Sequence, residues 1–246
     1  MKDMRDYDAA LRQAIKRFWD TRNKAKKVQG KKSGRKDTGN RTAVTSGGHL
    51  NGFIDLIVSI IHDAGIDEPN VFFKGHGSTI LPGYYRATKD WDIVVVADGT
   101  LVACIEFKSQ VGSFGNNFNN RTEESIGSAT DLWTAYREGA FSEQARPFLG
   151  YLAVLEDCPA SIKPVNVREP HFKVFPEFND ASYEQRYCLL CTRLVRERLY
   201  DAACLLMADR SGAKNGDYRE PSKEVSFHHF VASLWSHANA IQQTKD

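Results

Sequence analysis

The sequence lacks the features that mark membrane proteins and disulfide-stabilised secreted proteins. In its 246 residues no apolar run reaches the ~18 residues of a membrane-spanning helix, and the charged amino terminus has no apolar core of a signal peptide. The five cysteines are an odd number, which favours free thiols over a disulfide framework. We therefore expect a cytoplasmic protein with reduced cysteines.

A large excess of charge is also missing, since the net charge is only +2. The basic residues are nevertheless concentrated, because residues 21–42 hold nine Lys or Arg against one Asp. This segment is almost free of apolar residues, so we expect residues 20–47 to form an exposed loop or arm. Either its charges are simply solvated, or they pair with nucleic-acid phosphates; the candidates for phosphate contact are Lys31, Lys32, Arg35 and Lys36.

Two apolar stretches, residues 93–96 and 101–107, predict neighbouring β-strands joined at Asp98-Gly99. A three-residue loop, 98–100, would pair Ala97 with Leu101 and therefore place Asp92 opposite Glu106. Because side chains alternate along a strand, one face would carry Val102, Cys104, Glu106 and Lys108. The other face is expected to be the core, and it holds Leu101, Ala103, Ile105 and Phe107.

Carboxylates opposed at about 5 Å destabilise a sheet unless something neutralises them. Mg²⁺ does this well, because it prefers carboxylate oxygens and keeps several waters. A bound metal can polarise a phosphoryl oxygen, and a neighbouring lysine can hold the attacking water or offset charge on the phosphate. The pattern thus predicts phosphodiester hydrolysis, with Asp92 and Glu106 on Mg²⁺ and Lys108 beside them. A surface hairpin with a solvated ion pair is the alternative.

The segments around this hairpin contain further charged and amide side chains. Arg86, Lys89 and Asp90 precede it, and either phosphate contact or charge balance fits them. Residues 112–121 are expected to form a loop at the mouth of the site, before a helix that begins at Thr122. Asn and Arg suit the edges of adenine and guanine, although Asn is also a common turn residue. The candidate DNA contacts here are Gln110, Asn116, Asn117, Asn119, Asn120 and Arg121.

The remaining pattern predicts an α/β fold with a mixed central sheet flanked by helices. An apolar run over 148–155 is typical of a buried strand, and residues 159–179 are loop-like. Helices are expected over residues 1–19, 48–64, 183–209 and 227–241. We expect one domain over 1–246, with a catalytic core at 71–156 that contains the 92–108 hairpin, and with C-terminal helices over 181–242.

Asp92 followed on the next strand by Glu106-x-Lys108 resembles the PD-(D/E)XK nuclease pattern. Trp91 stands where the pattern is named for Pro, at a position that varies in the superfamily. Longer strings extend the likeness over nearly the whole chain. KDWDIVVV, IEFKSQVGSFGNNFNNRTEESIGSA, DLWTAYREG and EPHFKVFPEF resemble the XhoI-type restriction endonucleases.

That resemblance implies a restriction-endonuclease-like PD-(D/E)XK core with extra terminal helices. It also implies a Type II enzyme that cuts double-stranded DNA at CTCGAG with Mg²⁺ and leaves 5′ overhangs. The catalytic residues would be Asp92, Glu106 and Lys108, and the helix before the hairpin would offer Asp55 as a further metal ligand, unless Asp55 is a solvated helix acid. A palindromic target implies a homodimer, and a methyltransferase acting on the same site would protect the host.

Two other functions fit the residues less well. A structure-specific nuclease, such as a resolvase or a repair enzyme, would use the same catalytic groups without reading a sequence. A DNA-binding module with a vestigial site would need none of them, and the intact Asp92, Glu106 and Lys108 argue against it.

Overall fold

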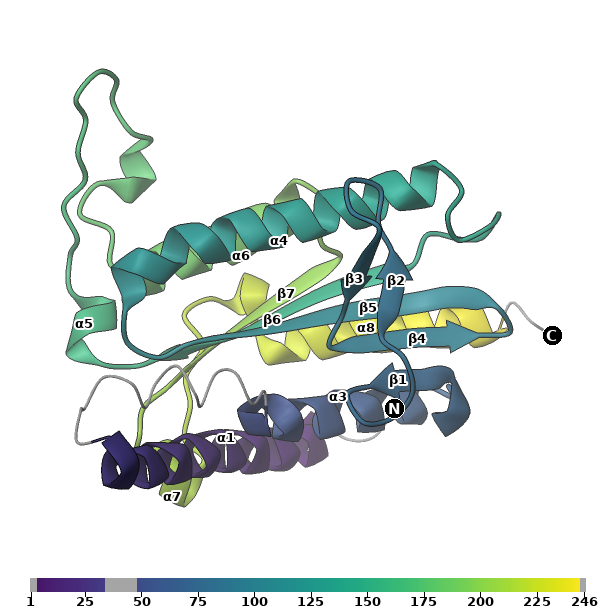
Figure 1. Cartoon of the computed structure of the whole chain (residues 1–246), viewed down its shortest axis with the longest axis horizontal. Coiled ribbons are helices and arrows are strands. Elements are labelled where there is room, and N and C mark those ends of the chain that lie inside the picture. Colours follow the sequence, from purple (N-terminus) through teal and green to yellow (C-terminus); the bar gives the residue numbers. More distant parts are fainter. Residues whose placement is uncertain (1–3, 34–47, 244–246) are drawn as a thin grey trace.

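The computed structural model describes residues 4–33 and 48–243, and a mixed β-sheet forms its centre (Figure 1). The five strands lie in the order β1-β4-β5-β6-β7. β1 (Val71–Phe73), β4 (Ile93–Ala97) and β5 (Thr100–Gln110) pair antiparallel. β6 (Phe148–Glu156) and β7 (Ala202–Ala208) continue from β5 in parallel. The expected mixed sheet is confirmed, and β5 is the strand at which it changes from antiparallel to parallel.

Helices cover both faces of the sheet (Figure 1). α4 (Phe114–Arg137) and α6 (Tyr183–Arg196) lie on one face, and α1 (Met4–Ser33), α3 (Asn51–Asp63) and α8 (Phe227–Gln243) on the other. Neighbours along β6 divide accordingly, because Tyr151 packs with the first layer and Leu152 with the second. Every residue of β6 is buried, as a strand covered on two sides requires. The predicted strand over 148–155 is confirmed.

Shorter elements connect these layers. They are η1 (Gly48–Leu50), η2 (Glu68–Asn70), α5 (Pro159–Ile162), η3 (Pro176–Phe178), α7 (Gly212–Asn215) and η4 (Lys223–Val225). A second, two-stranded sheet consists of β2 (Ile80–Pro82) and β3 (Thr88–Asp90), and it was not predicted. Within the two described ranges no helix combines the length and the apolar character that crossing a bilayer requires.

The first helix is longer than predicted, because α1 continues past Trp19 to Ser33. The residues that follow Trp19 include Lys, Arg, Gln and Ala, which are good helix formers. Arg22 is also buried, and its guanidinium lies 5.5 Å from the centroid of the Phe18 ring. Of the expected loop or arm, the loop is therefore wrong for residues 20–33, which are helical, whereas residues 34–47 lie outside the described part of the chain.

The predicted helix over 183–209 is wrong in its second half. α6 ends at Arg196, Arg198 has a positive φ of 57°, and the chain then forms β7. The run Ala202–Ala208 is buried throughout. A short run in which every residue is apolar fits a buried strand or a buried helix equally well. Such a run has no periodicity that could have distinguished the two, and the prediction chose the helix. The segment 181–242 thus contains the fifth strand of the sheet as well as helices.

The other helix predictions hold. Residues 48–64 form η1 and α3, and Gly65 follows with the positive φ of 96° that a helix C-terminus favours. α8 matches the helix expected over 227–241. Cys188 and Cys191 both lie in α6, and all five cysteines are free thiols.

Candidate active site

The β4–β5 hairpin positions the two acidic residues. Asp98 and Gly99 have positive φ values of 51° and 76°, which is the type I′ turn that Asp-Gly favours. Ala97 pairs with Thr100, so the loop has two residues, not the three predicted. A bulge next to Val95 and Val96 adds one residue on β5 and restores the expected register beyond it.

That bulge decides which face Glu106 occupies. Ile93 pairs with Ile105, so Asp92 and Glu106 occupy the next position along the two strands. Without the extra residue Glu106 would stand opposite Trp91, and the two acids would point to opposite faces of the sheet. The predicted opposition of Asp92 and Glu106 therefore depends on an irregularity that the sequence pattern did not reveal.

The bulge also changes the predicted faces at the start of β5. Val102 packs in the α1–α3–α8 layer, whereas Leu101 packs with Cys104 in the α4–α6 layer. Each of these two residues therefore lies on the face of the sheet opposite to the one predicted for it. The face that carries Cys104 and Glu106 is itself a buried core, so helices cover the hairpin on both sides rather than on one.

Glu106 is an ionised acid held between two lysines. Only 5% of it is exposed, Lys89 Nζ lies 2.7 Å from its Oε2, and Lys108 Nζ bonds its Oε1. Burial alone would raise the pKa of Glu106. The ammonium groups of Lys108 and Lys89 outweigh burial, so the pKa lies below its usual value.

Asp92 has the opposite electrostatic balance. Its Oδ2 accepts a hydrogen bond of 2.7 Å from the Phe107 backbone N–H. Burial, reinforced by the neighbouring Glu106 carboxylate, raises the pKa of Asp92 to about 6. The Phe107 hydrogen bond and the two lysines oppose this rise without cancelling it. Asp92 is thus a half-buried acid whose charged form would gain from a further cation.

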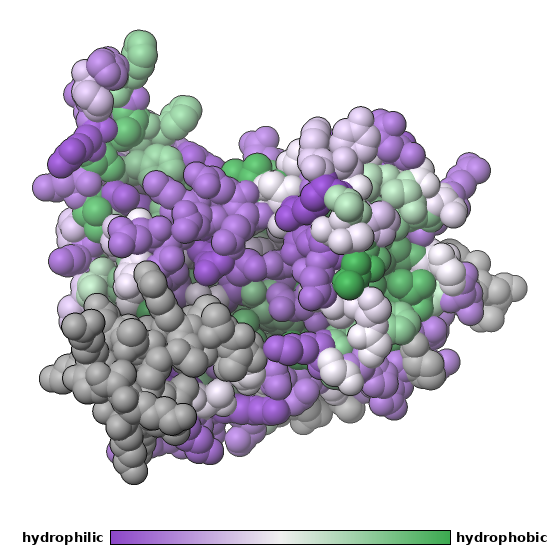
Figure 2. All heavy atoms as spheres, viewed as in Figure 1, coloured by the Kyte–Doolittle hydropathy of each residue, from purple (hydrophilic) through white to green (hydrophobic). Residues whose placement is uncertain are grey.

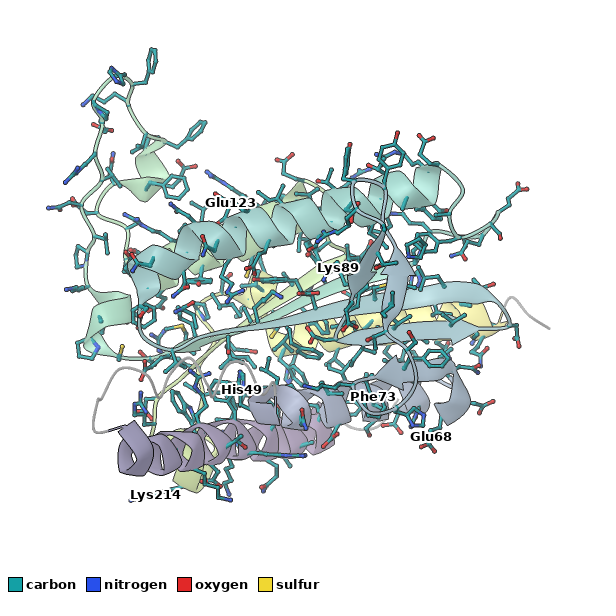
Figure 3. The ribbon with its side chains drawn as sticks, in the orientation of Figure 1. His49, Glu68, Phe73, Lys89, Glu123 and Lys214 are labelled. Carbon is teal, nitrogen blue, oxygen red and sulfur yellow. The ribbon has the colours of Figure 1, made fainter. Side chains whose placement is uncertain are left out.

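The β2–β3 hairpin delivers Lys89 to this pair. Lys89 pairs with Leu81 across the hairpin, and its Nζ lies 4.1 Å from the centroid of the Trp91 ring. The tip of the hairpin is fastened to α4, because buried Asp131 accepts hydrogen bonds from Tyr84 N, Tyr85 N and Arg86 Nε, at 2.8, 2.8 and 2.6 Å. Figure 3 places Lys89 between α4 and the main sheet.

A cleft of about 600 Å³ opens beside Asp92. Its walls come from α3, from the β1–β2 connection and from the start of β4, and they include Asn51, Ile54, Thr79, Asp90, Trp91 and Asp92. On the face shown in Figure 2, hydrophilic side chains gather in the band between α4 and the layer of α1 and α3. Asp92 therefore lies where a polar substrate can approach, with Glu106 buried behind the cleft wall.

The residues present fit a hard divalent cation. The two carboxylates belong to the residues just beyond the Ile93–Ile105 pair, and the positive charge around Asp92 does not fully offset its burial and the nearby Glu106. Among the residues that the structure describes, no cluster of three or more His, Cys, Asp or Glu side chains has the geometry of a metal site. Two acids plus water and substrate oxygens are the kind of ligand set that Mg²⁺ uses, because it keeps much of its hydration shell.

Residues 29–220 match the family of restriction endonuclease XhoI. Three curated relatives agree. The Type II restriction enzyme BstVI of Geobacillus stearothermophilus is 51% identical over 215 residues, which cover 84% of this chain and 94% of the relative. XhoI of Xanthomonas vasicola is 45% identical over 78% of this chain and 77% of its own. AbrI of Azospirillum brasilense is 46% identical over 70% of this chain and 76% of its own length. This chain belongs to the XhoI family of Type II restriction endonucleases.

The XhoI family match includes the whole of both hairpins, α4 and β7. No solved structure matches this chain. The match makes the protein a site-specific deoxyribonuclease, and its fold is an α/β sheet with helices on both faces.

Asp55, the candidate third ligand in this XhoI-family chain, is not brought to the acidic pair. Its exposed carboxylate pairs with Arg17 of α1, and it lines a different pocket, between α1 and α3. Asn51, one helical turn earlier on α3, lines the cleft beside Asp92 instead. The helix was predicted correctly, but the position on it that faces the cleft was not.

Gln110 also lies away from the cleft. Its side chain is buried, and its Nε2 donates to the Gly112 carbonyl, while Glu156 Oε2 accepts from Gly112 N at 3.0 Å. Gln110 therefore fastens the connection between β5 and α4. A predicted contact of this side chain with water or with DNA would require that connection to open.

The Asn-rich stretch is helical, so the loop predicted over 112–121 is wrong. α4 begins at Phe114, because Phe114 stacks on Tyr183 of α6 and Phe118, one turn later, packs edge-on against Tyr187. The opposite side of these turns is polar. Asn116, Asn119 and Asn120 are exposed, Asn117 Nδ2 donates to the Ser113 carbonyl, and Arg121 pairs with Glu124.

The four basic candidates lie in or beyond the last turn of α1. Lys31 and Lys32 are residues of the last turn of α1, and Arg35 and Lys36 lie outside the described residues. Their contact with DNA stays a prediction.

Lys89, which contacts Glu106, and Asp131, which anchors the hairpin that carries Lys89, were not among the predicted site residues. Lys89 precedes Asp92 by three residues, outside the Asp and Glu-x-Lys positions of the nuclease pattern. The sequence left it open between charge balance and phosphate contact, and its ion pair with Glu106 is charge balance. Asp131 lies one turn from the buried polar residues Ser128 and Thr134 of α4, and no motif in the sequence marked it.

Proposed function

We propose that this protein cuts both strands of duplex DNA at CTCGAG, leaving 5′ overhangs, by Mg²⁺-dependent hydrolysis. Membership of the XhoI family supports the reaction class and the target. The observation that carries the proposed chemistry is the meeting of Asp92, Glu106 and Lys108 beside an open cleft. The sheet, with its antiparallel β4–β5 hairpin and its parallel β5–β6 pair crossed by α4, supports a PD-(D/E)XK core.

In this proposal Asp92 and Glu106 hold Mg²⁺. When bound, the metal polarises a phosphoryl oxygen and lowers the pKa of a water ligand. Asp92 is kept in place by the Phe107 hydrogen bond and Glu106 by its two lysines. Lys108, the more exposed of those lysines, orients the attacking water or offsets the charge that grows on the phosphate.

DNA binding is proposed for two parts of the chain. The first is the exposed side of the first turns of α4, where Asn116, Asn119 and Asn120 present amide groups suited to base edges. The second is the basic segment 21–42, whose lysines and arginines suit phosphates. α4 follows β5 directly, so base contact and chemistry would lie on consecutive elements.

A homodimer is proposed because the target is two-fold symmetric. A projecting arm, residues 163–180, supports it (Figure 1). The arm leaves Phe172 and Phe175 exposed by 88% and 70%, and its three basic residues balance three acidic ones. A neutral arm with apolar side chains suits a protein surface better than DNA. Phe172→Ser with Phe175→Ser should lower the mass measured by light scattering from dimer towards monomer.

The central test is digestion of two plasmids that differ only in whether they carry one CTCGAG site. We expect a single linear product from the first with Mg²⁺, no product with EDTA and no cut in the second. Sequencing the ends should place the cuts so as to leave 5′ overhangs. Cutting of both plasmids, or of branched DNA alone, would contradict the proposed specificity, and no product from either would contradict catalysis.

A further inference from the structure

Lys89 occupies an unusual place for a residue outside the nuclease pattern. Its side chain is 11% exposed, against 22% for Lys108, so it is the more deeply buried of the two lysines on Glu106. Its Nζ lies 2.7 Å from Glu106 Oε2 and 3.2 Å from the Asp90 carbonyl oxygen. The ammonium thus sits against the carboxylate that the proposed metal would need.

The fold fixes Lys89 from several directions. β3 pairs with β2, and the Trp91 ring lies under the ammonium at 4.1 Å. Gly83 at the hairpin tip approaches Asp131 so closely that a Cβ there would lie 2.6 Å from Oδ2. Asp131 holds three donors of that tip at once. A side chain held in this way is preorganised rather than randomly placed.

Occupation of Glu106 creates a competition. One of its oxygens bonds Lys89 and the other bonds Lys108, so a divalent cation that approaches Glu106 is repelled by two ammonium groups. Moving one ammonium away relieves that repulsion. Asp92, by contrast, accepts its hydrogen bond from the Phe107 backbone N–H rather than from an ammonium group. The metal would therefore meet Asp92 open and Glu106 already bound to cations.

We propose that Lys89 is a positioning residue that acts as the exchangeable counter-ion of Glu106. In the metal-free protein it neutralises and holds the carboxylate. When a divalent cation binds Glu106, the ammonium is released towards the phosphate of bound DNA. This inference rests on the proposed nuclease function, and it joins the two interpretations of Lys89 that the sequence left open.

The exchange predicts effects of opposite sign. Lys89→Gln removes the competitor, so the free protein should bind Ca²⁺ and Mg²⁺ more tightly, by roughly tenfold. The same variant lacks the ammonium released towards the phosphate, so the cleavage rate at saturating Mg²⁺ should fall on the order of 10²-fold. A purely structural lysine would weaken metal binding and cleavage together.

The experiment is calorimetric titration of the DNA-free protein with CaCl₂ and with MgCl₂, followed by single-turnover cleavage of a duplex containing CTCGAG. Wild type, Lys89→Gln and Lys89→Arg are compared with Lys223→Gln, which removes an exposed positive charge from η4. We expect Lys89→Arg to stay near wild type in metal affinity and Lys223→Gln to match wild type in both measurements. Circular dichroism checks that each variant is folded.

Unchanged or weaker metal binding by Lys89→Gln would overturn the inference, as would a titration in which neither wild type nor variant binds the cation. If Lys89→Gln does not fold, an affinity of Lys89→Met that equals wild type would overturn it in the same way. The titration needs no DNA cleavage. A wild type that cuts no DNA would therefore contradict the proposed function while leaving the metal competition to be judged on its own result.

Discussion

The β2–β3 hairpin has an acidic site at each end, and the two sites differ in how fully neighbouring donors compensate their carboxylates. At its tip, buried Asp131 receives two backbone N–H groups and the Arg86 guanidinium, and its pKa lies below the usual value because these donors outweigh burial. At its base, Glu106 receives two lysines, but neighbouring Asp92 receives one backbone N–H and has a raised pKa. The carboxylate at the tip is fully compensated by its donors, whereas the Asp92 carboxylate at the base is not.

The difference separates an acid that stabilises structure from one that is available for binding. A carboxylate with all its acceptor positions filled gains little from a further cation. Two neighbouring carboxylates with incomplete compensation store an unfavourable interaction that a cation relieves. The four changes below test this contrast, beginning with the one for which we expect the largest effect.

Glu106→Ala should abolish cleavage, with a loss on the order of 10³-fold or more, because the proposed metal ligand and the partner of both lysines disappear. Binding to a duplex with CTCGAG should remain measurable by gel shift in Ca²⁺. Glu143→Ala, an exposed acid in the loop after α4, is the matched control and should cut normally. Cleavage by Glu106→Ala at the wild-type rate would remove Glu106 from the site.

Asp131→Ala should lower stability more than any other single change at the hairpin tip. It leaves two backbone N–H groups and Arg86 without their acceptor, at a cost of about 2 kcal/mol. Calorimetry should show a Tm lower by roughly 4–8 °C. Cleavage should fall only in part, since Asp92, Glu106 and Lys108 stay in place; a complete loss would place Asp131 in the chemistry.

Asp92→Asn should abolish cleavage yet stabilise the metal-free protein. The folded pKa of about 6 exceeds the model-compound value of 3.8, so the folded protein keeps a proton that the unfolded chain has lost between these values. Asp92 therefore contributes stability below about pH 4 that disappears as the pH rises through 6. We expect Asn to raise the Tm by roughly 2–4 °C at pH 7.5 and by nothing at pH 4.

A pH-independent shift for Asp92→Asn, or a lower Tm at pH 7.5, would show that Asp92 is as well compensated as Asp131. The measurement is a thermal scan at both pH values in EDTA, so that no divalent cation contributes.

Arg86→Ala should have the smallest effect. Asp131 keeps its two backbone donors, and the Arg86 side chain is 46% exposed, so the lost ion pair is worth about 0.5 kcal/mol. Chemical denaturation should show a small shift of the midpoint with unchanged slope. An effect as large as that of Asp131→Ala would mean that the guanidinium, not the backbone, anchors the tip.

The sequence predicted the local elements best where apolar periodicity and turn chemistry agreed. Asp98-Gly99 identified the β4–β5 hairpin, and the stripe from Phe53 to Ile61 identified α3. The pairing of Asp92 with Glu106 followed from a wrong loop length that a bulge happened to compensate. Short-range sequence patterns do not predict such a bulge, because its position depends on packing on both faces of the sheet.

Elements that depend on tertiary contacts were missed. The turns from Phe114 to Arg121 are rich in Asn, which disfavours helix, yet aromatic packing against Tyr183 and Tyr187 overrides that preference. β7 was predicted as helix because a run of apolar residues shows neither the two-residue period of a strand nor the 3.6-residue period of a helix. Lys89 reaches Glu106 through a hairpin whose position is set by Asp131, 42 residues later in the chain.

The connection between β5 and α4 has a mechanical consequence. It spans only residues 111–113, and Gln110 and Glu156 both clamp it at Gly112. Because the proposed base contacts lie on α4 and Lys108 lies on β5, a tilt of α4 against a mismatched base pair would be transmitted to Lys108 through this short connection. Fidelity in such an enzyme would then be set at the cutting step, by misalignment, as well as by how long a wrong site is held.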